Sequence, residues 1–298
     1  MCWLKLQGFF NINKPQGLTS FDVIRRIKKQ IPRKCKIGHL GTLDPMATGV
    51  LPVAVGNATR VIEYAAGVNK EYIAAFILGG VSDTQDATGQ ITIQQEEVIA
   101  DTDEVTGVLQ QFTGRIEQIP PMYSAVHHQG RRLYELARQG VEVVREPREV
   151  TIEAIELLEI SSAGKTTQVV IKVSCSPGTY IRTLVHDIGM RLGTGAYLNS
   201  LVRTRSGNFV LEQAVMLDEI VTAQDVNRYL LPIDHPLENM AVQELEAGQA
   251  LVVRQGRGIK GSSFLDQQRV RLYDGQQLAA IAFYDAAAGI LRPEKVFL

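Results

Sequence analysis

Apolar and polar residues alternate with clear periods along several stretches of the chain. The sequence predicts a helix that begins at the capping residues Thr19, Ser20 and Asp22 and ends at Pro32. Its apolar face consists of Phe21, Ile24, Ile27 and Ile31. Further helices are expected at 59–67, 103–112 and 183–192, with a short one near 132–139. Buried or alternating strands are expected at 49–56, 72–80, 91–93, 150–160 and 168–175. The stretches 33–48 and 81–89 are predicted as loops, and 115–148 as irregular.

The pattern changes in the last fifth of the chain. Between residues 245 and 298 the strand-like runs LVVR, RVRLY, LAAIAFY and ILRPEKVF are separated by Gly and Asp turns. This spacing predicts a small all-β module. Strands and helices interleave irregularly before it, so an α+β catalytic domain over 1–240 followed by a β-rich domain over 245–298 is favoured.

Composition narrows the class of protein. The chain has 298 residues, 45% hydrophobic and 21% charged, which is typical of a globular protein and excludes disordered and collagen-like structure. Its three cysteines lie far apart and form no disulfide framework, which favours a reducing cytoplasm. No apolar run approaches the roughly 20 residues of a membrane span, and the N-terminal stretch lacks the features of a signal peptide.

Charge is distributed unevenly although the net charge is only −1. Residues 1–70 carry 11 Lys and Arg against 3 Asp and Glu, whereas residues 71–120 carry 1 against 9. Two basic blocks separated by an acidic one could form a basic face for nucleic acid. The alternative is that Arg25, Arg26, Lys28 and Lys29 are simply the solvated side of a helix.

One carboxylate stands out by its surroundings. Asp44 lies in GHLGTLDPMATGVLPVAVGNATR (Gly38–Arg60), where glycines and a proline predict a rigid loop before a buried strand. Such a loop suits a nucleophile or a general base. An ordinary Asp-Pro turn is the alternative. A glycosidase pair would need a second acid, for which Asp83 and Asp86 are candidates. No motif for a metal or a nucleotide cofactor is present in the sequence.

Two further segments carry residues suited to chemistry or to RNA. In SPGTYIRTLVHDIG (Ser176–Gly189), Arg182 could pair with a carboxylate and Tyr180 could stack on a base. PPMYSAVHHQGRRLYELARQG (Pro120–Gly140) mixes aromatic, basic and glycine residues in a composition suited to gripping RNA. An edge tyrosine, a surface arginine and a basic loop without a partner are the simpler readings.

These segments, together with NINKPQGLTSFDVI (Asn11–Ile24) and KEYIAAFILGGVSDTQDATG (Lys70–Gly89), resemble in order the motifs of the bacterial TruB family of tRNA pseudouridine synthases. The resemblance runs from about residue 9 to residue 210. It implies a catalytic domain with a central mixed, mainly antiparallel sheet and flanking helices, an RNA-gripping insertion at about 115–148 and a small PUA-like domain. It implies cofactor-free conversion of uridine 55 in the T-loop of tRNA to pseudouridine, with the base flipped out of its stack.

The resemblance also assigns residues. Asp44 matches the catalytic aspartate, Tyr72 a tyrosine that packs against the target base, and Arg182 the arginine paired with the acid. Positions matching the pocket and the RNA contacts are His39, Arg60, Asp86, Tyr180, Leu201, Arg131 and Arg132. Two residues depart from the pattern: His127 stands where a lysine is usual, and Arg60 stands where some members have lysine.

Two other functions stay open beside the isomerase. One is an RNA-binding or chaperone protein without catalysis, and the other is a glycoside or nucleoside hydrolase. For the isomerase we expect the tRNA T-arm as partner, no metal, no membrane, no obligate protein partner and a monomer in the cytoplasm.

Overall fold

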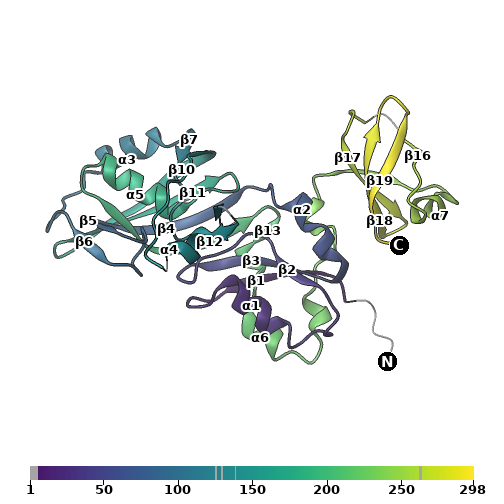
Figure 1. Ribbon diagram of the computed structural model, residues 1–298, viewed down its shortest axis with the longest axis horizontal. Helices are drawn as coiled ribbons and strands as arrows, with labels where there is room; N and C mark the ends of the chain where they lie inside the picture. The colour runs from purple at the N-terminus through teal and green to yellow at the C-terminus, as the bar shows by residue number, and fades with distance from the viewer. Residues whose placement is uncertain (1–5, 125, 129, 138, 262–263) are drawn as a thin grey trace.

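A ten-stranded mixed sheet forms the larger part of the molecule. The computed structural model describes residues 6–124, 126–128, 130–137, 139–261 and 264–298 (Figure 1). Along the sheet the strands are β14 (Val215–Met216), β1 (Gly8–Lys14), β3 (Thr48–Val55), β12 (Ala196–Ser206), β4 (Lys70–Leu78), β11 (Thr166–Cys175), β10 (Arg148–Ala163) and β7 (Gly114–Gln118). Two shorter strands attach to it, β2 (Ile37–His39) on β3 and β13 (Phe209–Val210) on β12.

Most neighbouring strands of this sheet run antiparallel, and only β1–β14 and β3–β12 are parallel. The expected α+β class with a mixed, mainly antiparallel sheet is therefore confirmed. Strand β12 lies between β3 and β4, so Arg203 is opposite Gly49 on one side and Tyr72 on the other. Segments far apart in the sequence thus meet at the middle of the sheet.

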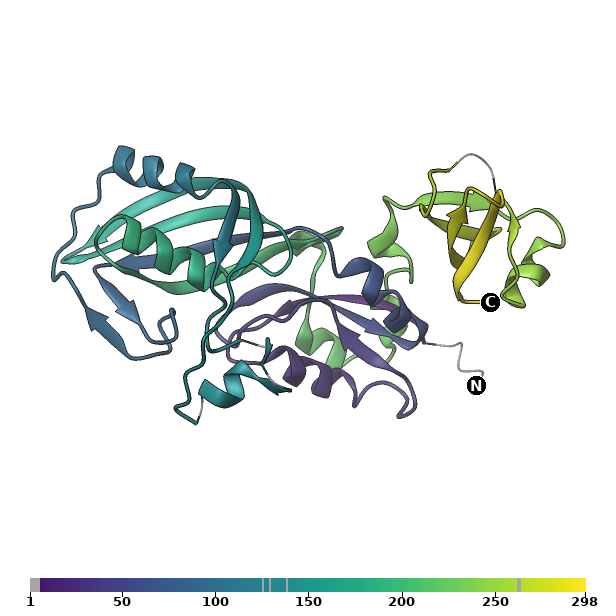
Figure 2. The ribbon, with the colours of Figure 1, turned by 45° about the horizontal axis from the view of Figure 1, so that its top comes forward.

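Helices cover the sheet in two places. The helices are α1 (Ser20–Ile27), α2 (Ile62–Ala65), α3 (Thr102–Gln111), α4 (Leu133–Ala137), α5 (Ile181–Arg191), α6 (Leu217–Val221) and α7 (Gln249–Arg254). Figure 2 shows α3 and α5 together over the half of the sheet that contains β10 and β11. Helices α1 and α6 pack together beside β1 (Figure 1). Val23, Ile24 and Ile27 of α1 enter the main core.

A second, five-stranded sheet forms a β-rich C-terminal domain, drawn in yellow-green and yellow in Figure 1. Its order is β15 (Ala241–Glu244), β17 (Arg269–Asp274), β18 (Gln277–Asp285), β19 (Ile290–Val296) and β16 (Ile259–Lys260). The first strand therefore starts at Ala241, ahead of the expected position 245. Phe297 and Ile281 share a buried cluster with Val61, which joins this domain to the first.

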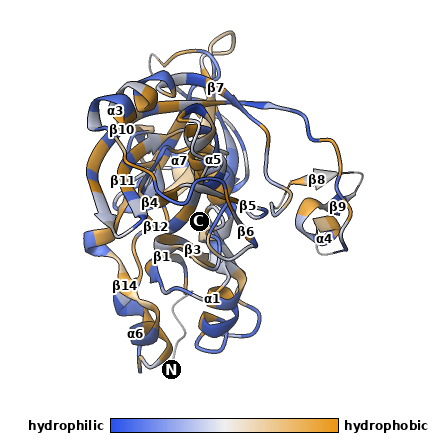
Figure 3. Ribbon diagram, turned by 90° about the vertical axis from the view of Figure 1, so that its left-hand side faces the viewer, coloured by the Kyte–Doolittle hydropathy of each residue, from blue (hydrophilic) through white to orange (hydrophobic). Residues whose placement is uncertain are grey.

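Several local predictions were wrong. The run LVVR is part of helix α7, not a strand, because a short apolar run fits either structure and here glycines bracket it. The loop predicted at 33–48 contains strand β2, and the stretch 115–148 contains β7, β8 (His127–His128) and β9 (Arg131–Arg132). Strand β12 was not expected at all. By contrast, the strand predicted at 91–93 is present as β6 (Ile91–Ile93), and it pairs with the short strand β5 (Gly80–Ser82). Figure 3 shows β8, β9 and α4 projecting as an arm from the body.

Candidate active site

The loop that carries Asp44 is tied to the rest of the protein on both sides of the carboxylate. Ser20 Oγ accepts a hydrogen bond from Leu43 N (2.8 Å) and donates one to Leu43 O (3.1 Å). Beyond Asp44, Pro45 O accepts from Gly17 N (2.8 Å) and from Lys14 Nζ (3.4 Å). These bonds confirm the rigid loop that the glycines and the proline predict.

Lys14, whose amine donates to Pro45 O of this loop, is completely buried. Its amine also donates to Leu18 O (2.7 Å) and Pro15 O (2.9 Å). Burial lowers the pKa of Lys14 to about 8, although the negative charge of Asp44 opposes that shift. Lys14 therefore brings a positive charge near Asp44 that is weakened by its own desolvation.

Arg203 is a second cation of the site with a completely buried side chain. Its guanidinium donates through Nε to Val50 O (2.6 Å), through Nη2 to Gly41 O (3.1 Å) and, more weakly, through Nη1 to Thr42 O (3.5 Å). It thereby holds both ends of the Asp44 loop against β12. Sequence reasoning assigns no role to Arg203 or Lys14, because charged residues normally indicate surface.

Arg182 pairs with Asp44, with Nε 2.9 Å from Oδ2. The arginine side chain is 4% exposed and the aspartate side chain 35% exposed. The remaining guanidinium nitrogens donate to Thr84 O (3.2 Å) and Tyr123 O (2.9 Å). The cation is therefore fixed by the protein, while the carboxylate that it holds still faces solvent. This is the pairing that the sequence predicts for an ionised, oriented acid.

Asp86 lies behind this pair and is almost fully buried. Its Oδ2 is 3.8 Å from Arg182 Nε. Its Oδ1 accepts from Thr84 Oγ1 (2.8 Å) and Thr88 N (2.9 Å), so the carboxylate fixes the loop that follows β5. Asp86 is thus close to Arg182, but its side chain is engaged within the protein.

Tyr72 and His39 stand near the same loop. Burial raises the pKa of Tyr72, and the nearby Arg203 guanidinium opposes the rise. Burial also lowers the pKa of His39, and Arg203 adds to that shift. At neutral pH both side chains are therefore uncharged. His39 Nδ1 is buried and has no hydrogen-bond partner within the described residues.

Tyr180 and Leu201 border the cluster from α5 and β12. Tyr180 is the N-cap residue of α5, and Gln118 bonds both to its N (3.0 Å) and to its O (3.2 Å). Leu201 is buried in β12 opposite Ala74. Tyr180 therefore caps the helix that presents Arg182, and Leu201 lies on the strand of Arg203, next to the strand β4 that presents Tyr72.

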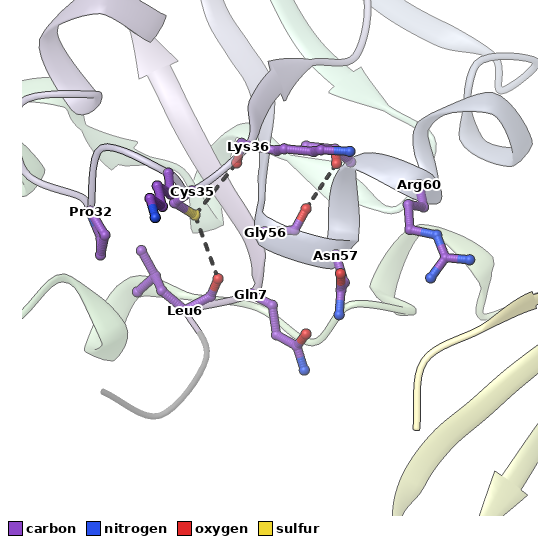
Figure 4. Close-up of a pocket in the computed structure, with 10 residues that line it drawn as sticks. Leu6, Gln7, Pro32, Cys35, Lys36, Gly56, Asn57 and Arg60 are labelled. Atoms are coloured by element: carbon purple, nitrogen blue, oxygen red, sulfur yellow. Dashed lines mark hydrogen bonds between the residues drawn. The ribbon is translucent and has the colours of Figure 1, made fainter. Parts of the chain in front are cut away.

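The remaining predicted residues lie elsewhere. Arg60 donates to Val296 O (2.7 Å) and covers the ring of Phe297, so it contacts the C-terminal domain. Arg60 also lines a pocket with Cys35 and Asn57 (Figure 4), and Asp44 is not among the residues that line this pocket. Arg131 is in the arm and donates to Gln139 Oε1 (2.9 Å). The side chains of Arg132 and His127 lie outside the described part of the structure, although their backbones form β9 and β8.

Two features are absent from the described residues. No group of three or more His, Cys, Asp or Glu side chains is placed to hold a metal ion. Among the same residues, no helix is both long enough and apolar enough to cross a membrane.

Comparison with known proteins places these residues in a family. Residues 28–181 match the family model of the TruB family pseudouridylate synthase N-terminal domain, and residues 182–238 match that of the tRNA pseudouridylate synthase B C-terminal domain. The chain is 53% identical over 279 residues to tRNA pseudouridine synthase B of Syntrophomonas wolfei, covering 93% of each chain. It is 42% identical over 300 residues to the protein of that name from Heliobacterium modesticaldum, covering 99% of this chain and 96% of the relative.

Solved structures show the same fold. A chain in the crystal structure of a Cbf5-Nop10-Gar1 complex aligns with a TM-score of 0.73 and 28% identity, covering 98% of this chain and 85% of that one. A chain in the structure of an H/ACA RNP bound to a substrate RNA containing 2'-deoxyuridine aligns with a TM-score of 0.72 and 26% identity, with the same coverage.

Proposed function

The chain belongs to the TruB family of pseudouridylate synthases, and we propose that it converts uridine 55 in the T-loop of tRNA to pseudouridine. The observation that carries the proposal is the Asp44–Arg182 pair, a solvent-facing carboxylate held 2.9 Å from a buried guanidinium. The names of the relatives support tRNA as the substrate. The residue matches within the family support the T-loop site.

The reaction rearranges one nucleoside without a net change in atoms. The C1′–N1 bond breaks, the uracil turns, and a C1′–C5 bond forms. The proton on C5 leaves, and N1 gains one. No external oxidant, reductant or leaving group is required, so we propose that neither cofactor nor metal takes part.

Asp44 is the group that we propose assists cleavage of the C1′–N1 bond. Arg182 engages Oδ2, and within the described residues no hydrogen bond is formed to Oδ1. One carboxylate oxygen therefore faces the substrate while the other fixes its direction. Whether the carboxylate attacks the sugar or the base, the buried cation keeps it oriented.

Tyr72 and His39 supply two uncharged rings close to the Asp44 loop. We propose that the Tyr72 ring packs against the target uracil and that its hydroxyl handles the proton at C5. We propose that His39 occupies the space that the flipped base leaves in the RNA. An uncharged imidazole suits this place because it can stack on bases without the cost of burying a cation.

We propose that the protein acts as a monomer in the cytoplasm, with the T-arm of tRNA as its partner and without an obligate protein partner. We propose that Arg131 and Arg132 of the arm grip the T-arm, whereas Asp86, Tyr180 and Leu201 line the substrate pocket or hold its hydrogen-bond network nearer the acid. Arg60 would then act close to the C-terminal domain and not beside the reacting base.

Tritium release from a tRNA transcript labelled at uracil C5 tests the proposal. We compare wild type with Asp44→Asn and with Asp274→Asn, a matched change at an exposed acid on β17 of the C-terminal domain. Wild type and Asp274→Asn should release tritium from position 55, and Asp44→Asn should be at least about 1000-fold slower. Equal rates for all three proteins would refute the role of Asp44.

The same experiment separates the two other functions. Binding of tRNA without tritium release by wild type would indicate an RNA-binding or chaperone protein. Free uracil in the supernatant would indicate a hydrolase. Tyr72→Phe tests the hydroxyl alone, because it keeps the ring; we expect RNA affinity to persist and turnover to fall. Unchanged turnover would remove the hydroxyl from the proposal.

A further inference from the structure

Helix α1 places an aromatic ring in water. Phe21 is 63% exposed, and it is the only aromatic residue in the exposed class among those the structure describes. The helical spacing predicts that Phe21 shares a buried face with Ile24, and this prediction was wrong. The buried face of the helix consists of Ser20, Val23, Ile24 and Ile27. The ring thus contributes little to the core.

The first turn of α1 holds this ring beside a cation. Thr19 and Asp22 form a capping box, with Asp22 N 3.0 Å from Thr19 Oγ1 and Thr19 N 3.0 Å from Asp22 Oδ2. Asp22 Oδ1 then fixes Arg25 at 2.9 Å, and the Arg25 guanidinium carbon lies 5.4 Å from the centre of the Phe21 ring. Arg25 covers one face of the ring, and the side chains of both residues remain largely exposed.

The same turn is joined directly to the candidate active site. Ser20, which precedes Phe21, is buried and makes both of its hydrogen bonds with Leu43. Leu43 in turn precedes Asp44. Two bonds therefore connect the residue before Phe21 with the residue before the acid, so that the exposed ring keeps a fixed position relative to the carboxylate.

Charge indicates what would bind this surface. Helix α1 and its end add Arg26, Lys28 and Lys29 to Arg25, within a 70-residue block that carries 11 Lys and Arg against 3 Asp and Glu. An aromatic ring with a cation over one face and the other face free is suited to unpaired nucleic acid, in which a base can stack on the free face while a phosphate contacts the cation. A neutral or a basic partner would not match this charge.

We propose that Phe21 and Arg25 form a stacking platform for an unpaired nucleotide of the substrate RNA that flanks the reacting uridine. The proposal rests on the proposed function, since it takes the RNA to be the substrate of Asp44. The base stacks on the free face of the Phe21 ring, and Arg25 contacts the adjoining phosphate.

Binding measured without turnover tests the platform. In an Asp44→Asn background, the dissociation constant for a T-arm RNA hairpin is compared for Phe21, Phe21→Ala and Phe21→Trp. Loss of one base stack should weaken binding by roughly 5- to 150-fold in Phe21→Ala, and Phe21→Trp should restore it. Leu251→Ala is the matched control, because Leu251 is 62% exposed on α7 in the C-terminal domain.

The two halves of the platform should differ in their response to salt. Arg25→Met should reduce the slope of log affinity against log salt by about one, because one phosphate contact is lost. Phe21→Ala should leave this slope unchanged. Equal affinity of Phe21→Ala and its parent, or an equal loss in Leu251→Ala, would overturn the platform.

Failure of the platform and failure of the proposed function give different results. Tritium release by wild type together with normal RNA binding by Phe21→Ala would refute only the platform. No tritium release by wild type, with the Phe21 effect on binding still present, would refute only the isomerase. Thermal unfolding of Phe21→Ala should match that of its parent, since the ring is not part of the core.

Discussion

Arg203 offers the sharpest test of how the fold positions Asp44. The change is Arg203→Met, which keeps an unbranched apolar side chain in the same space but removes the guanidinium. Two well-formed hydrogen bonds disappear, at 2.6 Å to Val50 O and 3.1 Å to Gly41 O, whereas the 3.5 Å contact with Thr42 O is weak. The carbonyls of Val50 and Gly41 both lose a buried donor.

The magnitude follows from these two acceptors. A buried polar group without its partner costs about 1–3 kcal/mol, which gives about 2–6 kcal/mol for the pair. The Arg203 cation has no carboxylate within 4.0 Å among the described residues, so burying it is unfavourable. Met removes this desolvation cost, which makes the loss of stability smaller. We expect the free energy of unfolding to fall by about 2–4 kcal/mol. A displacement of the Asp44 loop by about 1 Å should also reduce turnover about 100-fold.

Urea unfolding followed by far-ultraviolet circular dichroism measures the first effect, and single-turnover tritium release at saturating tRNA measures the second. Affinity for tRNA should stay within about threefold, because Arg203 is completely buried. Arg205→Met is the matched control on the same strand. The Arg205 side chain is half exposed, and its Nη2 makes a long contact of 3.7 Å with Glu71 Oε2. The reasoning is refuted if both variants behave alike, or if Arg203→Met retains wild-type stability and turnover.

Three further predictions concern other parts of the molecule. Burial lowers the pKa of Lys14 to about 8 from 10.5, so between these pH values the unfolded chain binds more protons than the folded one. Urea unfolding at pH 7.5, 9 and 10 should therefore show wild type gaining stability relative to Lys14→Met as the pH rises, by up to about 1.4 kcal/mol per pH unit; a pH-independent difference would contradict this. Gly49→Ala should prevent stable folding, because φ is +98° and a Cβ would lie 2.9 Å from the backbone nitrogen of Arg203. Gly107→Ala is the control, because Gly107 lies in open space on α3, and thermal melts should show this variant to be as stable as wild type or more stable. Arg60→Met should speed amide exchange in β19, because it removes the bond to Val296 O and the contact with the Phe297 ring, and unchanged exchange would argue against this domain contact.

The sequence predicts the reactive residues of the site better than it predicts the buried residues that hold them in place. The glycines and proline around Asp44 predict a rigid loop, and the loop's hydrogen bonds confirm it. The guanidinium of Arg182 pairs with that acid, as its residue type suggests. The loop is predicted from neighbouring residues alone, whereas the partner of Asp44 is assigned by the family resemblance, because residue type alone leaves a surface arginine as the simpler alternative for Arg182.

The support depends on contacts between distant segments, which local patterns do not contain. Strand β12 escapes prediction because polar residues interrupt its apolar positions and register shifts break the alternation. Arg203 therefore gives the usual signal of a surface arginine, although β12 places it between β3 and β4. Phe21 shows the opposite error, because helical spacing alone predicts burial for a ring that lies beyond the edge of the core.

The central position of β12 has a consequence for the synthesis of the protein. Strands β3 and β4 leave the ribosome early, but β12 separates them in the finished sheet and ends only at Ser206. Until that residue emerges, β3 and β4 each present an unpaired edge, and the carbonyls of Gly41 and Val50 lack the hydrogen bonds from Arg203. Pairings of such long sequence separation form slowly. The nascent chain therefore acquires its reactive geometry late and in one step, when the last-made central strand enters between two that were made first.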